Sequence, residues 1–337
     1  MLRWLKEILN KGRDNPLTYA EASEAAASIA SGESSDIQAA AFLIAERMKG
    51  ESPESVAAFL EVFRGYSISV KRSPTTICIA GSAESGTYFP LTLAICMMTA
   101  SVGMSYVVTG TEQRPSGGQL KGSGAVGASG KECAGVWERM LKDTRMVYID
   151  IETYCPPLQH LRAIRGELGI ATLLNTVEKM LNPFSSQHAL IGVEDANETL
   201  RLQPLLTSAG FESGYLVNGL GGTEVLPLDR ITQIRKVTVY GDETTYIDPD
   251  LFGFGKKQPL ALTDQSLMPS LERILQGEED GELIQLRNYL IFNAGLRLYW
   301  FERVNSFEEG FMLAKSLLQR KSAAKSFRRW LDLSSSR

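Results

Sequence analysis

The sequence is poor in the residues that build metal centres and disulfide frameworks. Of its 337 residues, four are cysteines and two are histidines. Cys78, Cys96, Cys133 and Cys155 are far apart in the chain and form no C-x-x-C pair. Structural zinc sites need clustered cysteine or histidine ligands, and disulfides are rare in reducing compartments. We therefore expect neither a zinc site nor disulfide bonds.

Long hydrophobic runs are also missing. The longest one, residues 91–108, is interrupted by threonine, serine and glycine, whereas a membrane-spanning helix needs about 20 predominantly apolar residues. The segment Met1–Glu7 is amphipathic and lacks the apolar stretch and cleavage site of a secretory signal. We expect no membrane association and a cytoplasmic location.

The chain has no overall excess of positive charge. Its 35 lysines and arginines face 39 acids, for a net charge of −4, which argues against nucleic-acid binding by bulk attraction. The C-terminal segment differs, because Asp332 is its single acid. Its basic residues are Lys315, Arg320, Lys321, Lys325, Arg328, Arg329 and Arg337. This pattern fits either the solvated face of a last helix or an edge that contacts phosphates.

Helix-start signals dominate the first 70 residues. Thr18 with Glu21, and Ser35 with Gln38, have the spacing of a capping box. A third start combines a serine cap with proline and glutamate at 52–54. Each is followed by apolar residues at helical spacing, so we predict a small bundle of three or four helices.

After residues 71–74 short apolar runs alternate with helical patterns. Strands are predicted over 75–80, 104–109, 146–151, 189–193, 214–218 and 236–240, a helix over 90–101, and helices again over 281–331. Alternation of this kind is typical of a mainly parallel sheet with helices on both faces. The predicted fold class is α/β. It has a small all-helical domain over 1–70, on which helices from about 158–185 pack, and a larger α/β domain over 71–337.

A glycine-rich stretch covers residues 109–131. Such a loop exposes backbone N–H groups to a phosphate, or serves as a lid without a ligand. Residues 125–132 resemble a P-loop, but Glu132 stands where a magnesium-binding hydroxyl is needed. The P-loop interpretation is therefore disfavoured.

Three groups of segments, in this order, resemble the anthranilate phosphoribosyltransferase family. They are residues 17–22 with 32–54, residues 165–175 with Asn182-Pro183, and residues 287–299 with 308–314. The middle group is similar to the family pattern R-x-E-L-G-x-R-T-x-x-N…N-P. The resemblance implies a helical domain joined to an α/β domain, dimerisation through the helical domain, and phosphoribosyl transfer assisted by magnesium.

The family's phosphate-binding turn is altered in this chain. Residues 80–92 stand where the family has G-T-G-G-D-G followed by T-F-N-x-S-T. Ala80 and Ala83 replace glycines that let the backbone close on a pyrophosphate, and Phe89 and Leu91 replace an asparagine and a magnesium-binding serine. The turn therefore offers fewer contacts to a phosphorylated donor.

Two further motifs depart from the family. In the segment that corresponds to K-H-G-N-R, Val108 and Glu112 stand in place of the lysine and arginine. Of the acid pair in H-G-x-D-G-x-D-E, Glu224 alone remains. Magnesium needs oxygen ligands to neutralise a departing pyrophosphate, so we expect the family reaction to be impaired.

These departures suggest a branch of the family. Residues 154–165 and 218–230 resemble divergent paralogues, one of which binds nucleic acid; their K-G-x-E-G-x-x-E-x-P segment has Asn218 and Gly221 here in place of its lysine and first glutamate. We predict binding of a phosphate-bearing partner, such as single-stranded nucleic acid, in place of a role in tryptophan synthesis. The alternatives are a transferase with a changed donor or acceptor, and anthranilate phosphoribosyltransferase itself.

The candidate residues follow from these comparisons. For substrate or phosphate they are Gly81, Ser82, Thr87, Thr92, Gly110 and Arg165, and for a metal ion Glu224. The candidates for nucleic acid are Lys121, Lys131, Arg162, Arg320, Lys321, Lys325, Arg328 and Arg329. In the family the arginine that matches Arg165 meets the carboxylate of anthranilate; its alternative role is an ordinary ion pair. No cofactor is expected, apart from magnesium if the protein is an active enzyme.

Overall fold

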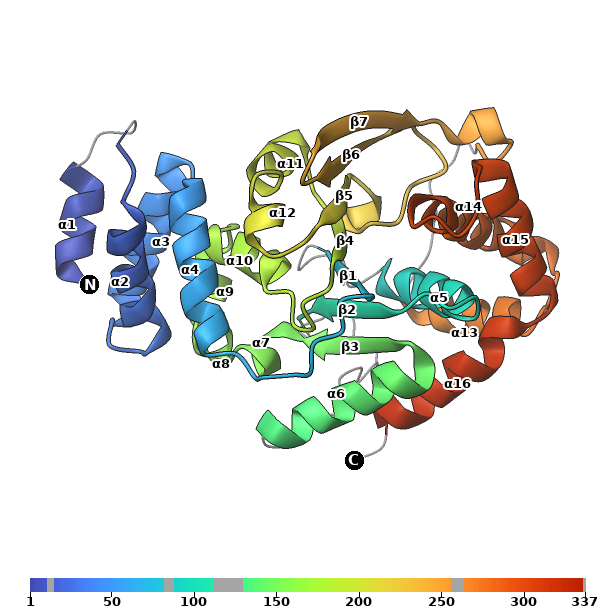
Figure 1. Ribbon diagram of the computed structural model, residues 1–337, viewed down its shortest axis with the longest axis horizontal. Coiled ribbons are helices and arrows are strands. Elements are labelled where there is room, and N and C mark those ends of the chain that lie inside the picture. Colours follow the sequence, from blue (N-terminus) through green and yellow to red (C-terminus); the bar gives the residue numbers. More distant parts are fainter. Residues whose placement is uncertain (11–14, 82–87, 112–129, 256–263, 336–337) are drawn as a thin grey trace.

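A helical bundle stands beside a larger sheet-containing body in the computed structural model (Figure 1). The structure describes residues 1–10, 15–81, 88–111, 130–255 and 264–335. The bundle helices are α1 (Leu2–Asn10), α2 (Tyr19–Ala30), α3 (Asp36–Lys49) and α4 (Pro53–Gly65). Thr18 and Ser35 form capping boxes with Glu21 and Gln38, and the Ser52 side chain caps α4. The predicted helix starts are therefore confirmed.

Seven strands form one mixed sheet in the order β3-β2-β1-β4-β5-β6-β7. The first five in this order are parallel, and β6 and β7 are antiparallel. The strands are β1 (Ile77–Ala80), β2 (Tyr106–Gly110), β3 (Met146–Asp150), β4 (His188–Gly192), β5 (Ser213–Val217), β6 (Thr232–Thr238) and β7 (Gly241–Ile247). The predicted mainly parallel sheet is confirmed. The sequence did not predict β7, because it is an exposed edge strand with few apolar residues.

The remaining helices surround the sheet and join its strands. They are α5 (Phe89–Ala100), α6 (Gly130–Thr144), α7 (Ile151–Tyr154), α8 (Pro156–His160), α9 (Arg162–Leu168), α10 (Leu173–Met180), α11 (Ala196–Leu202), α12 (Leu205–Ser208), α13 (Asp264–Leu275), α14 (Ile284–Trp300), α15 (Phe307–Gln319) and α16 (Ser322–Ser335). Short 3-10 turns are η2 (Leu220–Gly222), η3 (Pro249–Phe252) and η4 (Gly281–Leu283). No helix in these described ranges is both long and apolar enough to cross a membrane.

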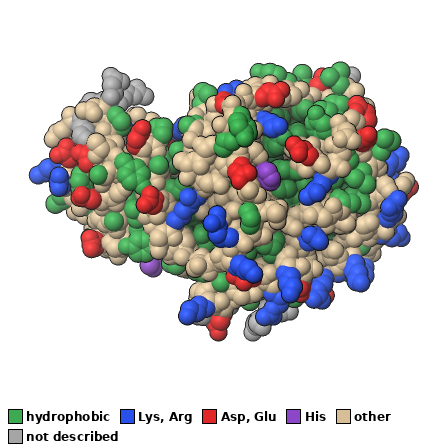
Figure 2. All heavy atoms as spheres, in the orientation of Figure 1, with side chains coloured by type: hydrophobic (Ala, Val, Ile, Leu, Met, Phe, Trp, Pro, Cys, Tyr) green, Lys and Arg blue, Asp and Glu red, His purple; other side chains and the backbone are tan. Residues whose placement is uncertain are grey.

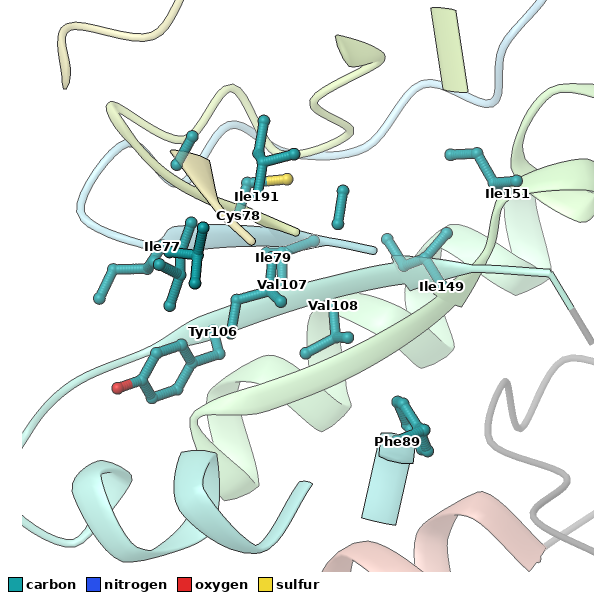
Figure 3. Close-up of a cluster of buried hydrophobic side chains, with 14 of the residues drawn as sticks. Ile77, Cys78, Ile79, Phe89, Tyr106, Val107, Val108, Ile149, Ile151 and Ile191 are labelled. Atoms are coloured by element: carbon teal, nitrogen blue, oxygen red, sulfur yellow. The ribbon is translucent and has the colours of Figure 1, made fainter. Parts of the chain in front are cut away.

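Side chains from both faces of the sheet are buried. Tyr106 of β2 hydrogen-bonds to Thr99 of α5 on one face, at 2.6 Å. Cys78 follows Ile77, the register partner of Tyr106, and therefore points to the opposite face of the sheet (Figure 3). Burial raises the pKa of the Cys78 thiol to about 12, although the Arg64 charge lowers it. All four cysteines are buried with free thiols.

The bundle and the sheet body are joined by direct contacts. Helices α8, α9 and α10 contact α2, α3 and α4. The Arg64 guanidinium donates hydrogen bonds to the carbonyls of Met180 at 2.8 Å, Leu181 at 3.2 Å and Ala209 at 2.6 Å. The expected domain boundary near residue 70 falls between the end of α4 and the start of β1. The contacts fix where the bundle meets the ends of the strands.

Candidate functional site

A cleft of about 150 Å³ opens at the carboxyl ends of β1, β2 and β4, beside the helical bundle. The chain runs from β1 outward to β2 and β3 on one side and returns to β4 and β5 on the other. The β1/β4 boundary is therefore the topological switch point, where open α/β sheets bind their ligands. The cleft is lined by Arg47, Ala80, Gly81, Thr109, Gly110, Thr111, Ile151, Ala171, Thr172, Asn175, Thr176, Glu178, Lys179, Glu194, Asp195, Asn197, Glu198 and Arg201.

Two of the predicted phosphate contacts reach this cleft. Gly81 follows β1 and Gly110 ends β2, and both are among the residues that line it. Ser82 and Thr87 lie outside the described residues. The parallel strands bring Gly81 and Gly110 together, although they are far apart in the sequence.

Thr92 and Glu224 belong instead to a buried network. The Thr92 hydroxyl donates to Glu224 Oε1 at 2.7 Å, and Arg297 Nη2 donates to the same oxygen at 2.5 Å. Glu224 is 2% exposed and Arg297 1%. Neither Thr92 nor Glu224 lines the cleft, so the structure does not bring them to the other predicted site residues, and their predicted contacts to phosphate and metal stay predictions. Arg297, which no sequence motif singled out, neutralises the carboxylate inside the core.

The described residues therefore do not fit a magnesium ion at Glu224. The carboxylate is buried and its charge is already neutralised by Arg297, and it lies outside the lining of the cleft, so it is a poor ligand for a hard cation there. Nor do three or more acidic, histidine or cysteine side chains converge into a metal site anywhere in the part of the chain that the structure describes.

Arg165 is engaged with a neighbouring carboxylate. Its Nη1 and Nη2 atoms donate to the two oxygens of Glu178, at 2.5 and 2.8 Å. Burial lowers the pKa of Arg165, but the charge and hydrogen bonds of Glu178, together with the Glu152 charge, outweigh this effect and raise the pKa. Of the two roles considered for Arg165, the structure shows the ion pair. Glu178 lines the cleft, and it occupies the guanidinium that was expected to meet a substrate carboxylate.

Three cations border the cleft, and no sequence motif pointed to any of them. Lys179 Nζ donates to Glu198 at 2.6 Å and to the Gly192 carbonyl at 2.9 Å. Arg47 and Arg201 both approach the buried carboxylate of Glu51, at 3.5 and 3.9 Å. Two guanidinium groups thus share one carboxylate at distances longer than normal hydrogen bonds. This Arg47–Glu51–Arg201 cluster carries a surplus positive charge.

The acidic side chains that line the cleft after β4 mainly accept hydrogen bonds from nearby backbone N–H groups. Asp195 Oδ1 accepts from the Glu198 N–H at 2.7 Å and caps α11. Glu198 Oε2 accepts from the Glu194 N–H, also at 2.7 Å. The cleft therefore has an acidic wall after β4, and the surplus positive charge lies where Arg201 of α11 meets Arg47 and Glu51 of the bundle.

Sequence comparison places this arrangement in a family. Residues 89–324 match the model of the α/β domain of a glycosyl transferase family, and residues 4–67 match the helical bundle domain of the same family. The chain belongs to this glycosyl transferase family. It is 26% identical over 337 residues to an anthranilate phosphoribosyltransferase from Rubrobacter xylanophilus, covering 98% of this chain and 97% of the relative. It is 28% identical over 315 residues to an uncharacterized protein from Aquifex aeolicus, covering 90% and 94%.

Solved structures of this glycosyl transferase fold resemble the whole chain. Anthranilate phosphoribosyltransferase from Saccharomyces cerevisiae, in complex with 4-fluoroanthranilate, superposes with a TM-score of 0.82 at 18% identity, covering 100% of this chain and 98% of that one. The enzyme from Thermus thermophilus gives a TM-score of 0.75 at 21% identity, covering 98% and 99%. At these identities the likeness shows the fold.

The residues predicted to bind nucleic acid fall into two groups, one between residues 121 and 162 and the other near the C-terminus. Arg162 is paired with Glu152, Lys131 is exposed in the first turn of α6, and Lys121 lies outside the described residues. The described C-terminal cations among these candidates, residues 320, 321, 325, 328 and 329, are exposed, and Figure 2 shows Lys and Arg side chains gathered at the lower right of the molecule, over α6 and α16. A shallow basic groove beside α13 and α16 is lined by Gln276, Lys321, Ala324, Lys325, Arg328, Arg329 and Asp332. Arg320 is exposed at the end of α15, outside this lining.

Proposed function

We propose that this chain binds a phosphate-bearing small molecule, of the phosphorylated-ribose class, in the switch-point cleft and does not transfer phosphoribosyl to anthranilate. The observation that carries the proposal is the Arg47–Glu51–Arg201 cluster. Its two guanidinium groups have only one carboxylate between them, and guanidinium is suited to phosphate recognition. The yeast relative of the same fold has been solved with phosphoribosyl pyrophosphate and magnesium, which supports this ligand class.

The position of Glu224 supports the proposed absence of transfer. Departure of pyrophosphate needs charge neutralisation, which magnesium supplies in the family. Here the Glu224 carboxylate is held by Arg297 and Thr92 in the core. Arg165, which would orient anthranilate, is held by Glu178. Binding of a phosphate group does not depend on these residues, whereas the transfer reaction does.

The test is calorimetric titration of the purified protein with ribose 5-phosphate and with phosphoribosyl pyrophosphate, each with and without magnesium. We expect both to bind, with affinities that fall as salt is raised and change little with magnesium. Arg47→Gln should weaken binding roughly tenfold, because it removes one guanidinium. Arg139→Gln, which changes an exposed arginine on α6, is the matched control.

Two outcomes would contradict the proposal. One is a strong magnesium-dependent gain in affinity for phosphoribosyl pyrophosphate. The other is consumption of anthranilate in its presence, or complementation of a tryptophan auxotroph. These results would favour the alternative that the chain is an active transferase, as the names of several curated relatives suggest. Thermal unfolding of each variant distinguishes lost binding from lost folding.

A second candidate function is nucleic-acid binding at the basic groove. The specific observation is that Lys321, Lys325, Arg328 and Arg329 are exposed and line one depression. Arg329 also contacts Asp143 of α6 at 3.0 Å, so part of its charge is compensated. A fluorescent single-stranded oligonucleotide should bind with steep salt dependence, and Lys325→Glu with Arg328→Glu should abolish binding. Affinity that does not change with salt would count against this function.

Dimerisation through the helical bundle is likewise a proposal. Leu2, Leu9, Ile37 and Met48 are large apolar side chains of α1 and α3 that are exposed in the single chain. Burying such side chains is the main driving force of stable association. Sedimentation should therefore show a dimer that Ile37→Glu weakens.

A further inference from the structure

A second cavity, of about 220 Å³, shares Thr176 and Arg201 with the lining of the switch-point cleft. It is formed where the turn between α3 and α4 meets α11 and the start of α12. Its lining residues are Gly50, Glu51, Pro53, Val56, Thr176, Leu200, Arg201, Pro204 and Leu205. Glu51 borders this cavity and not the cleft. For comparison, an engineered protein cavity of roughly 150 Å³ accepts benzene.

Two polar atoms of this cavity are buried without a hydrogen-bond partner among the described residues. They are Oε1 of Glu51, an acceptor, and Nε of Arg201, a donor. The Glu51 side chain is 1% exposed. Its Oε1 atom lies 3.5 Å from Arg47 Nη1 and its Oε2 atom 3.9 Å from Arg201 Nε, and both ion-pair contacts are longer than normal hydrogen bonds. A buried polar atom without a partner costs about 1–3 kcal/mol, so such atoms need an explanation.

The rest of the lining is mainly apolar. Val56 and Leu205 are buried, Pro204 lies between α11 and α12, and Leu200 is 67% exposed at the rim. The cavity therefore combines an apolar wall with one acceptor and one donor placed close together. Small-molecule sites have this composition, in which a few convergent polar groups fix the orientation of an apolar ligand.

We propose that this cavity binds a free α-amino acid with an apolar side chain. Its ammonium group donates to Glu51 Oε1, its carboxylate accepts from Arg201 Nε, and its side chain packs against Val56, Leu200 and Leu205. A zwitterion meets both unpartnered atoms at once and leaves the local net charge unchanged. A phosphate or a simple carboxylic acid satisfies Arg201 alone, and an amine satisfies Glu51 alone.

L-Leucine is the first probe, titrated into the full chain by calorimetry in buffer free of phosphate. We expect saturable binding, at least tenfold tighter than that of 4-methylpentanoate, which lacks the ammonium group, and of isoamylamine, which lacks the carboxylate. L-Glutamate should bind weakly, because its side chain places a charge against the apolar wall. The probes bear no phosphate, so the result is independent of the proposed function of the cleft.

Three variants assign the binding to this cavity. Glu51→Gln should weaken leucine binding at least tenfold, and Arg201→Lys should weaken it while keeping a positive charge beside the cleft. Leu200→Asp changes an exposed rim residue, so it tests the apolar wall with little risk to folding. Glu54→Gln is the charge-matched control. It changes an exposed glutamate in the first turn of α4, three residues after Glu51, and this variant should bind leucine as the parent does.

The proposal is overturned if no apolar amino acid in a panel of leucine, valine, methionine and phenylalanine binds at about 10 mM. It is also overturned if leucine binds equally well to Leu200→Asp and to the parent chain. Should Glu51→Gln fail to fold, the comparison of leucine with its two truncated analogues and the Leu200→Asp result still decide the matter.

Discussion

Glu224 shows how the environment of a residue sets its role. The sequence predicted this carboxylate as a metal ligand, yet Arg297 and Thr92 both donate to it in the core. The Arg297 Nη1 atom also donates to Cys96 Sγ, at 3.2 Å. Burying two opposite charges is costly unless each is well paired, and this pair has several further hydrogen bonds. The residue therefore acts as a structural group.

Removing one partner of this pair should destabilise the protein strongly. Arg297→Met leaves the Glu224 charge buried and uncompensated, so we expect a loss of about 3–5 kcal/mol in the free energy of unfolding. Urea denaturation measures this loss. The double variant Arg297→Met with Glu224→Gln should recover a large part of it, and an equal loss in the double variant would show that packing, and not charge, is responsible.

Glu46 on α3 should make stability depend on pH. Burial raises its pKa from 4.5 to about 7, and Ser55 lowers it only in part. Because the folded-state pKa lies above the unfolded one, the folded chain holds the proton more tightly, and stability falls as pH rises from about 4.5 to 7. Over this pH range the free energy of unfolding should fall by on the order of 3 kcal/mol. Glu46→Gln should remove this decline, as seen by comparing urea midpoints of the two proteins at about pH 5 and pH 8.

At the scale of elements, the backbone at the end of β4 lies very close to the backbone of residues 222–223. A Cβ atom on Gly192 would lie 2.2 Å from the Gly222 carbonyl oxygen and 2.6 Å from Thr223 Cα. No side chain fits in this space without moving η2 and the segment that carries Glu224. The absence of a side chain at Gly192 therefore lets the 220–224 segment pack directly on the sheet.

Gly192→Ala should accordingly cost about 3 kcal/mol or more, since overpacking displaces main chain here. Gly135 offers the matched control, because it lies inside α6 and a Cβ atom added to it would meet nothing within 4 Å. Gly135→Ala should stabilise the protein by about 0.5–1 kcal/mol through helix propensity. Thermal unfolding of both variants measures their stability. A gain in both variants, or a loss in both, would contradict the prediction.

At the scale of the whole molecule, Arg64 makes several of the hydrogen bonds that hold the helical bundle against the sheet body. Arg64 of α4 donates to three carbonyl oxygens that belong to α10, its end, and the end of α12. These acceptors would otherwise lack partners at the contact between the two parts. The same contact forms one side of the region that carries the cleft and the second cavity.

Arg64→Met should loosen this contact. We expect a loss of roughly 2–4 kcal/mol, because hydrogen bonds from a charged donor are removed and buried carbonyls remain. Hydrogen exchange should speed up in α10 and α12 more than in β1 and β2. Arg139→Met, on the exposed face of α6, serves as control and should leave exchange unchanged. Uniform acceleration throughout the chain would mean that Arg64 does not act at this contact in particular.

Local patterns predicted much of this fold. The capping boxes at Thr18 and Ser35, and the apolar runs of β1 to β5, depend on neighbours in the sequence and were correctly placed. The edge strand β7 was missed because its Asp242, Glu243 and Thr245 are exposed and the strand has no apolar alternation. Of the candidate site, Gly81 and Gly110 were predicted from family motifs and do line the cleft.

The sequence by itself determined the helix starts, the buried strands and the family, because these depend on residue type and short spacing. Only the tertiary structure decided which charges meet. Arg165 pairs with Glu178, 13 residues away, and Glu224 with Arg297, 73 residues away. Arg47 and Arg201 come from separate domains to one carboxylate. A charged side chain is a ligand contact or a structural pair according to the partner that folding brings beside it, and the chain order does not contain that information.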